Sequence, residues 1–241
     1  MDLSSKVILV TGANRGIGAA VVQEMLKADV AKIYAAARDP KTLPSFADAR
    51  VVPLQLDITS DTSVSAAAAI ATDVDVLINN AGTLAFGDLL TSHWETFEAD
   101  MRTNYFGTLR VLRAFVPQFV TRKSGAIVNV GSVVGLSAIP LMAGYSASKA
   151  ALHSITQSLR GSLEKYNIAV LGIYPGPVDT ELARAVPYPD KATPEHAAAN
   201  IVKGIVEEQT YVFPDPMAQQ AEQLWSTDNR KLEHRTLHLG A

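Results

Sequence analysis

The sequence predicts one α/β domain over residues 1–241, a Rossmann-like doubly wound parallel sheet of about seven strands with helices on both faces. Short apolar runs rich in β-branched residues alternate with longer amphipathic segments. The short runs are apolar at nearly every position, which is typical of parallel strands buried on both faces. Each group of chemically distinctive residues follows such a run, and ligands of open α/β sheets bind at the carboxyl ends of the strands.

The expected elements alternate from the start of the chain. Strands are predicted for the apolar runs Lys6–Thr11, Lys32–Ala37, Val51–Leu56, Val74–Ile78, Ala126–Val130, Ile168–Tyr174 and Thr210–Phe213. Helices are predicted for the segments Ile17–Ala28, Asp61–Ala71, Trp94–Phe106, Thr108–Val120, Ser146–Lys165 and Pro194–Glu208. Thr59 or Ser60 is expected to cap the second helix and Thr193 the last. The polar segment Pro214–Ala241 is expected to be a C-terminal extension, partly helical or loosely packed.

The composition excludes several classes of function. The 21 basic and 24 acidic residues nearly balance, which argues against a nucleic-acid partner. The absence of cysteine excludes disulfides, thiol nucleophiles and Cys-based metal sites. His234 and His238 supply too few ligands for a metal site, so no metal is expected. The start of the sequence lacks a signal-peptide pattern and the apolar runs are strand-length, so we expect a cytoplasmic protein without a membrane partner.

A glycine-rich turn, Thr11-Gly12-Ala13-Asn14-Arg15-Gly16-Ile17-Gly18, follows the first predicted strand. Glycines allow a sharp turn and a close backbone approach to a pyrophosphate, and the following helix points free N–H groups at the anion. The plainer alternative is an ordinary tight turn. The spacing TGxxxGIG resembles that of the short-chain dehydrogenase/reductase family. The expected cofactor contacts in this turn are Gly12, Asn14, Arg15, Gly16, Ile17 and Gly18.

The end of the second strand bears on which nicotinamide cofactor is bound. In the family, an Asp that selects NAD falls at the position aligned with Ala37. Arg38 follows, and two guanidinium groups from Arg15 and Arg38 are suited to clamp a 2′-phosphate. The sequence therefore favours NADP(H). In the alternatives, both arginines are solvated surface charges, or Asp39 approaches the ribose instead.

Tyr145 and Lys149 form a YxxxK pair on a predicted helix, where positions four apart share a face. A nearby ammonium favours the phenolate, which would make Tyr145 a workable acid or base. An isolated match would more often be a surface pair. In the family, a serine placed like Ser132 holds the substrate oxygen, and an asparagine placed like Asn104 holds a water touching the lysine. The resemblance therefore implies four catalytic residues, namely Asn104, Ser132, Tyr145 and Lys149.

Three further motifs are similar to those of the family and imply more cofactor contacts. Asp57 would accept from the adenine amino group, although such a residue also suits the cap of the next helix. Asn79-Asn80-Ala81-Gly82 matches the family's NNAG motif near the ribose. The segment from Pro175 to Thr180 matches its PG motif, in which backbone and hydroxyl hold the nicotinamide amide. The implied contacts are Asp57, Ile58, Asn80, Ala81, Gly82, Tyr145, Lys149, Pro175, Gly176, Val178 and Thr180.

The resemblance covers about Lys6 to Pro214 and implies an NADP(H)-dependent carbonyl reductase or alcohol dehydrogenase, with Tyr145 as general acid or base. The substrate is expected to be a mostly apolar ketone, aldehyde or secondary alcohol. A homodimer or homotetramer is expected through the helices Thr108–Val120 and Ser146–Lys165. The alternatives are a non-catalytic NADP-binding sensor or scaffold, and an epimerase or dehalogenase on the same fold. The expected apolar pocket residues are Leu84, Phe86, Ile139, Met142, Leu182, Val186 and Tyr188.

Overall fold

A seven-stranded parallel sheet forms the centre of the computed structural model, which describes residues 1–186 and 188–237. The strand order is β3-β2-β1-β4-β5-β6-β7, so the direction of winding reverses between β1 and β4. This arrangement confirms the predicted fold class. The strands are β1 (Val7–Thr11), β2 (Lys32–Ala37), β3 (Val51–Gln55), β4 (Val76–Asn79), β5 (Gly125–Val130), β6 (Ile168–Ile173) and β7 (Tyr211–Val212).

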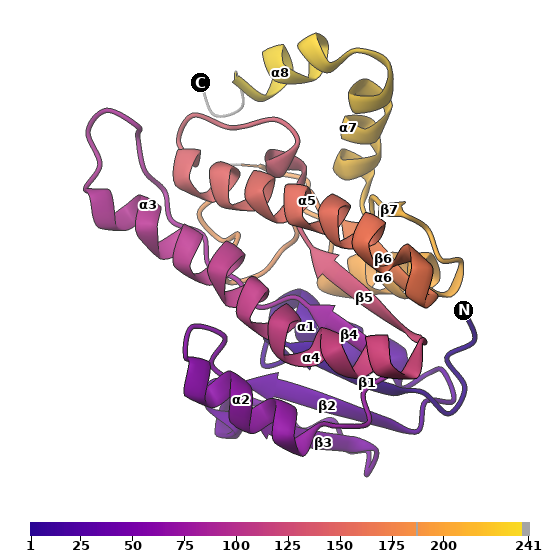
Figure 1. Ribbon diagram of the computed structural model, residues 1–241. Coiled ribbons are helices and arrows are strands. Elements are labelled where there is room, and N and C mark those ends of the chain that lie inside the picture. Colours follow the sequence, from indigo (N-terminus) through magenta and orange to yellow (C-terminus); the bar gives the residue numbers. More distant parts are fainter. Residues whose placement is uncertain (187, 238–241) are drawn as a thin grey trace.

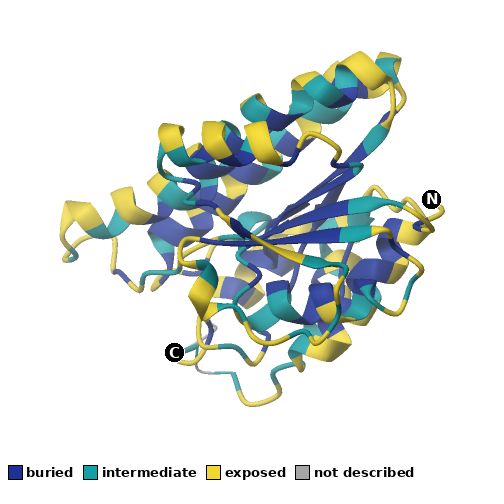
Figure 2. Cartoon of the chain, turned by 90° about the horizontal axis from the view of Figure 1, so that it is seen from below, coloured by how far each residue is buried: buried dark blue, intermediate teal, exposed yellow. Residues whose placement is uncertain are grey.

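Helices cover both faces of the sheet (Figures 1 and 2). On one face, α1 and α6 pack against the strands in one apolar cluster, and on the other α2, α4 and α5 do so in a second. The helices are α1 (Gly16–Met25), α2 (Asp61–Ile70), α3 (Trp94–Asp100), α4 (Thr108–Arg122), α5 (Ala143–Leu163), α6 (Pro194–Val206), α7 (Pro216–Thr227) and α8 (Asn229–Leu237), and short 3-10 turns lie at Pro40–Thr42, Val133–Gly135 and Glu164–Tyr166.

Burial on both faces does not extend to the edge strand β3. Residues in β1, β2, β4, β5 and β6 are almost all buried, but Val52 is 36% exposed and Pro53 is exposed as well. The prediction of strands buried on both faces was wrong for β3 because it has a neighbour on one side alone. A proline is tolerated at such an edge because the sheet needs fewer of its donors there.

The helix ends follow local capping chemistry. The Ser60 side chain caps α2 by accepting from the Ser63 amide, and the Thr193 side chain caps α6 by accepting from the His196 amide. Of the two caps predicted for α2, Ser60 is therefore the correct one. Pro194 occupies the start of α6, where its missing N–H costs nothing.

The helices α3 and α4 are joined by a π-helical stretch, Met101–Gly107, rather than by a break. The segment Trp94–Phe106 is therefore helical as predicted, with an α-helical first half and a π-helical second half. Gly107 packs against Ile58: a Cβ at Gly107 would lie 2.9 Å from that side chain. Short π-helical insertions recur at functional sites because they realign the side chains around them.

The C-terminal segment forms α7 and α8, the yellow helices of Figure 1, on the side of α5 and β7. Trp225 of α7 meets Tyr211 and His153 edge-on, with ring centroids 5.3 and 6.0 Å apart respectively. Leu232 of α8 is buried in the same apolar cluster. Aromatic contacts of this kind stabilise packing beyond the buried area alone, so they hold α7 beside the end of the sheet.

Candidate active site

The glycine turn between β1 and α1 forms one wall of a groove at the carboxyl edge of the sheet. Gly12 and Gly16 have φ angles of +66° and +55°, a region that other residues disfavour. A Cβ at Gly18 would overlap the carbonyl oxygen of Gly12. The N-cap residue of α1, Arg15, makes no side-chain cap, and the first turn holds no acidic residue. The amide groups and positive end of α1 can therefore receive an anion.

The glycine turn and the Asn79–Gly82 motif are held together because β1 and β4 are neighbours in the sheet. The hydroxyl of Thr11 accepts from the amides of Asn80 and Ala81, both at 3.0 Å. The Asn80 side chain donates to the carbonyls of Thr11 and Gly12 at 3.0 and 3.2 Å. The sequence analysis assigned no role to Thr11. The feature that could have indicated one is its hydroxyl group at the end of an otherwise apolar strand.

The groove has a volume of about 930 Å³. Gly18 was predicted to contact the cofactor but does not line the groove; it is buried where the turn packs on itself. The residues predicted to contact a cofactor line the groove in large part: Gly12, Asn14, Arg15, Gly16, Ile17, Arg38, Asp57, Ile58, Asn80, Ala81, Gly82 and Thr180.

Arg15 and Arg38 stand at the open side of the groove. Ala37 is buried at the end of β2, and Arg38 follows it with an exposed side chain. One guanidinium nitrogen of Arg15 lies 2.5 Å from the Glu181 carboxylate, and both side chains are more than half exposed. Asp39 is engaged in its own turn, where its carboxylate accepts from the Lys41 amide at 3.0 Å. Arg15, Arg38 and Asp39 all line the groove, and Arg15 is held in its ion pair with Glu181.

Asp57 lies between the groove and α2. Its carboxylate accepts from the amide and the hydroxyl of Thr59 at 2.9 and 2.7 Å. Burial raises its pKa, but these hydrogen bonds and the charge of Arg38 together hold the pKa below its ordinary value. Because Ser60 caps α2, Asp57 is not the helix cap that the sequence also allowed.

Tyr145, Lys149 and Ser132 come together at the end of β5. The helix α5 begins at Ala143, three residues earlier than expected, so that Tyr145 and Lys149 lie on consecutive turns of one helix. The Ser132 side chain lies close enough to the Tyr145 side chain to influence its ionisation, and both line one pocket. The Lys149 ammonium donates to the Val130 carbonyl at 2.8 Å and lies 5.7 Å from the centre of the tyrosine ring. All three side chains are buried.

The ionisation of this trio differs from the expectation that Lys149 lowers the pKa of Tyr145. Burial raises the pKa of Tyr145 above its ordinary value, the Ser132 side chain opposes that rise, and the charge of Asp100 adds to it. Burial also lowers the pKa of Lys149 to about 8, with Asp100 opposing the decrease. The phenol is therefore protonated at neutral pH and can act as a proton donor.

Asn104 sits within the π-helical stretch and is fully buried. Its side-chain oxygen accepts from the Thr83 amide at 2.8 Å, and its side-chain nitrogen donates to the Thr83 carbonyl and the Ser148 hydroxyl, both at 2.9 Å. Its carbonyl accepts from the Thr108 hydroxyl at 2.9 Å. Asn104 therefore ties the segment after β4 to α5 between Tyr145 and Lys149.

The Pro175–Thr180 loop follows β6 and closes the site. The Ser132 hydroxyl donates to the Pro175 carbonyl at 3.3 Å. The Gly176 amide donates to the Asp215 carboxylate at 2.7 Å, which links this loop to the start of α7. Asp215 was not singled out in the sequence because its partner lies 39 residues away.

A pocket of about 140 Å³ opens beside Ser132, Tyr145 and Lys149. It shares Thr83 and Thr180 with the groove, so the two form one continuous site. Met217 of α7 and Leu141 also line it, and sequence reasoning missed both. The pocket brings together all the apolar residues expected there, Leu84, Phe86, Ile139, Met142, Leu182, Val186 and Tyr188, and three residues expected near the nicotinamide, Pro175, Gly176 and Val178.

The site fits a nicotinamide dinucleotide. The uncapped helix start and the close-packed glycine turn suit a pyrophosphate. The same groove meets the pocket that holds the tyrosine, and Ile17 of the glycine turn lines both. A turn suited to phosphate and a buried phenol thus belong to one continuous site.

Comparison with known proteins agrees with this geometry. The family model for short chain dehydrogenase matches residues 6–190. This chain is a short-chain dehydrogenase/reductase. A short chain dehydrogenase from Burkholderia cenocepacia, solved in complex with NADP, shares 38% identity over 98% of this chain and 99% of that one, with a TM-score of 0.92. A relative from Burkholderia phymatum in complex with NAD shares 25% identity over 93% of this chain and 94% of that one, with a TM-score of 0.83.

Among curated proteins, this dehydrogenase/reductase is 32% identical to the dehydrogenase/reductase SDR family protein 7-like of Anopheles gambiae, over 91% of this chain and 78% of the relative. In the described part of the chain, no helix has the length and apolarity needed to cross a membrane. Within the same residues, no group of three or more His, Asp or Glu side chains is placed to hold a metal. His238 lies outside the described residues.

Proposed function

We propose that this short-chain dehydrogenase/reductase is an NADP(H)-dependent carbonyl reductase or alcohol dehydrogenase, with Tyr145 as general acid or base. The observation that carries the proposal is the buried group of Tyr145, Ser132 and Lys149 at the junction of the groove and the apolar pocket. A proton donor, a second hydroxyl and an ammonium meet there.

In the proposed reaction, NADPH supplies a hydride to the carbonyl carbon when it is bound in the groove. The Ser132 hydroxyl holds the carbonyl oxygen and stabilises the charge that develops on it. Tyr145, whose pKa burial raises, gives its proton to that oxygen. Lys149 stabilises the resulting phenolate through its positive charge. Alcohol oxidation uses the same residues in reverse.

The preference for NADP(H) is proposed from the end of β2. Ala37 provides no carboxylate for a ribose 2′-hydroxyl, and Arg15 and Arg38 both line the groove. Guanidinium groups recognise phosphate by paired hydrogen bonds. The solved relatives include one complex with NADP and one with NAD, so this preference rests on the residues of this chain.

The substrate is proposed to be a mostly apolar ketone, aldehyde or secondary alcohol. Apart from the proton-handling residues, the pocket is lined chiefly by aliphatic, aromatic and methionine side chains. Such walls favour apolar groups and leave Ser132 and Tyr145 as the polar contacts that orient the oxygen.

A cytoplasmic homodimer or homotetramer that contacts neither nucleic acid nor membrane is also proposed. The outer faces of α4 and α5 are the proposed contact surface, and they lie side by side on one face of the sheet (Figure 1). Light scattering after gel filtration measures the oligomeric state. A monomer at micromolar concentration would contradict this part of the proposal.

The function is tested by NADPH consumption against a panel of ketones and aldehydes, with NADH as control. We expect turnover of at least one apolar carbonyl, with NADPH preferred over NADH. A sensor or scaffold would bind NADPH without consuming it, and an epimerase or dehalogenase would change its own substrates with no net NADPH loss. Either result would contradict the proposed reaction.

A further inference from the structure

A buried carboxylate that the proposed reaction does not use lies next to the site. Asp100, the last residue of α3, is 0% exposed. In residues 1–186 and 188–237 it forms no salt bridge within 4.0 Å. An ionised side chain removed from water is costly unless an opposite charge or hydrogen bonds compensate it. The position of Asp100 therefore calls for a compensating group nearby.

Asp100 holds the segment that follows the cofactor motif after β4. One carboxylate oxygen accepts from the Thr83 hydroxyl at 2.9 Å, and the other accepts from the Ala85 amide at 3.2 Å. Two hydrogen bonds satisfy part of the carboxylate but supply no positive charge. Asp100 thus fixes the wall between the groove and the pocket, since Thr83 lines both.

A chain of hydrogen bonds continues from this wall to the catalytic helix. Thr83 exchanges backbone hydrogen bonds with the Asn104 side chain, which donates to the Ser148 hydroxyl at 2.9 Å. The Ser148 hydroxyl in turn donates to the Tyr145 carbonyl at 2.7 Å. The buried network that starts at Asp100 therefore ends on the backbone of the proposed proton donor.

Lys149 borders the same wall from the other side. A Cβ at Gly82 would lie 2.9 Å from the Asn104 amide oxygen and 3.7 Å from the Lys149 ammonium. The helices α3 and α5 are in close contact, because a Cβ at Gly144 would lie 3.0 Å from the Cα of Phe97. Asp100 lies about one turn beyond Phe97 in α3, and Lys149 lies between one and two turns beyond Gly144 in α5.

Few ionisable groups face Lys149 in the described part of the chain. The helix α3 contributes Asp100 and α5 contributes Tyr145, whereas β5 contributes the uncharged Val130 carbonyl. Burial lowers the pKa of Lys149 to about 8, and the charge of Asp100 counteracts that decrease. Reciprocally, burial raises the pKa of Asp100, while its hydrogen bonds and Lys149 oppose that rise.

We propose that Asp100 is a positioning residue whose buried negative charge keeps Lys149 protonated at neutral pH. The inference rests on the proposed function, in which the ammonium stabilises the phenolate of Tyr145. Asp100 touches neither substrate nor cofactor in this scheme. It acts through the charge of Lys149 and through the wall at Thr83.

The direct test is the pKa of Lys149, measured by NMR titration of protein labelled with ¹³C at the lysine ε-carbon. The Lys149→Met variant identifies the resonance. In Asp100→Asn, which keeps an acceptor for Thr83 but removes the charge, we expect this pKa to fall by about one unit, a tenfold change in proton affinity. An unchanged pKa would overturn the proposal.

Ser148→Ala is the matched control because it breaks the same network without changing any charge. In Ser148→Ala, the pKa of Lys149 is expected to match that of the wild type. If this pKa fell as far as in Asp100→Asn, loosened packing and not the lost charge would explain the decrease, which would contradict the proposal. In a reductase assay, the loss of activity at alkaline pH is expected to begin about one pH unit lower in Asp100→Asn but not in Ser148→Ala.

A reciprocal measurement keeps the proposal testable if Asp100→Asn does not fold. Coupling between two sites is mutual, so Lys149→Met should raise the pKa of Asp100 in protein labelled with ¹³C-aspartate. No rise would contradict the inference. The titrations need no turnover, so they decide on Asp100 even if the carbonyl panel shows that the proposed function is wrong.

Discussion

At the scale of single residues, Tyr145 occupies a setting that favours its protonated form. The phenol is buried, and the nearby carboxylate of Asp100 disfavours a second negative charge. A neutral phenol is the form that the proposed reduction requires to protonate a carbonyl oxygen. Oxidation of an alcohol would need a phenolate, which the positive charge of Lys149 has to stabilise.

Arg38→Asp tests whether Arg38 recognises the 2′-phosphate of NADP(H). Loss of a guanidinium and gain of a like charge should weaken NADPH binding by about 10- to 100-fold, because charge-assisted hydrogen bonds contribute about 1.5–3 kcal/mol. NADH, which lacks this phosphate, should lose far less. Fluorescence titration of both cofactors provides the comparison.

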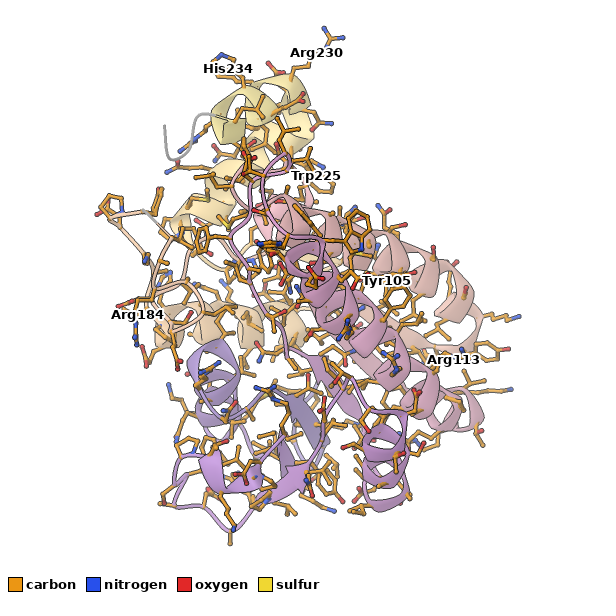
Figure 3. All side chains as sticks on the ribbon, turned by 90° about the vertical axis from the view of Figure 1, so that its left-hand side faces the viewer. Tyr105, Arg113, Arg184, Trp225, Arg230 and His234 are labelled. Atoms are coloured by element: carbon orange, nitrogen blue, oxygen red, sulfur yellow. The ribbon has the colours of Figure 1, made fainter. Side chains whose placement is uncertain are left out.

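Arg230→Asp is the control for the change in net charge. Arg230 belongs to α8 and points outward at the top of the molecule, away from the groove (Figure 3). The Arg230→Asp variant should bind NADPH with the same affinity as the wild type. Equal losses of NADPH and NADH affinity in Arg38→Asp would show that Arg38 does not recognise the 2′-phosphate.

At the scale of elements, Asp215 joins α7 to the loop that follows β6. One carboxylate oxygen caps α7 by accepting from the Ala218 amide at 2.9 Å, and the other accepts from the Gly176 amide at 2.7 Å. A Cβ at Gly176 would lie 2.7 Å from the same carboxylate, so this position suits glycine. One buried side chain therefore fixes both a helix start and a wall of the site.

Asp215→Ala should weaken both the fold and the site. It leaves two amides without their partner, which should lower the free energy of unfolding by about 2 kcal/mol. The loop at Gly176 should also become less ordered, so NADPH affinity should fall severalfold. Chemical denaturation and cofactor titration measure the two effects.

Ser60→Ala is the matched control, because Ser60 caps α2 outside the residues that line the groove and the pocket. It should lower the free energy of unfolding by about 1 kcal/mol and leave NADPH affinity unchanged. If Asp215→Ala also left the NADPH affinity unchanged, the hydrogen bond between Asp215 and Gly176 would not be needed to hold the cofactor site.

At the scale of the whole molecule, the pocket is assembled from parts that are distant in the sequence. Leu84 follows β4, Met142 precedes α5, Leu182 follows β6 and Met217 belongs to α7. The C-terminal segment therefore contributes a wall of the site and is not a separate appendage. Its contact with the pocket depends on the aromatic packing that holds α7 beside β7.

Met217→Ala tests the contribution of α7 to substrate choice. A shorter side chain enlarges the pocket, so the ratio of kcat/KM for a bulky ketone over a small one should rise by about tenfold. Leu224→Ala on the same helix is the control, since Leu224 packs in the apolar cluster and does not line the pocket. The same ratio in both variants would contradict the assignment of Met217.

Local patterns made the fold and most of the site predictable. The strands could be located because they are short apolar runs, and Tyr145 and Lys149 because four residues make about one helical turn. The glycine turn and the Asn80 motif each follow a strand, and the neighbouring positions of β1 and β4 bring them together. The sequence therefore placed these groups on one edge of the sheet without knowledge of any contact.

Other features depend on contacts that no local pattern reveals. In the sequence, Asp100 has the pattern of a polar residue on the exposed face of an amphipathic helix. In the structure, packing against the segment after β4 buries it completely. The π-helical turn around Asn104 forms where Gly107 meets Ile58, 49 residues earlier in the chain. The pKa of Tyr145 was predicted to fall because the charge of Lys149 could be read from the spacing, whereas the depth of burial could not.

Deuteride transfer in wild type and Tyr145→Phe tests the central claim most directly. With NADPH carrying deuterium at the transferred position, the wild type should give an alcohol labelled at its carbinol carbon, detected by mass spectrometry. Tyr145→Phe should bind NADPH with similar affinity and form almost no labelled alcohol. Comparable labelling by the variant, or unlabelled alcohol from the wild type, would contradict the account.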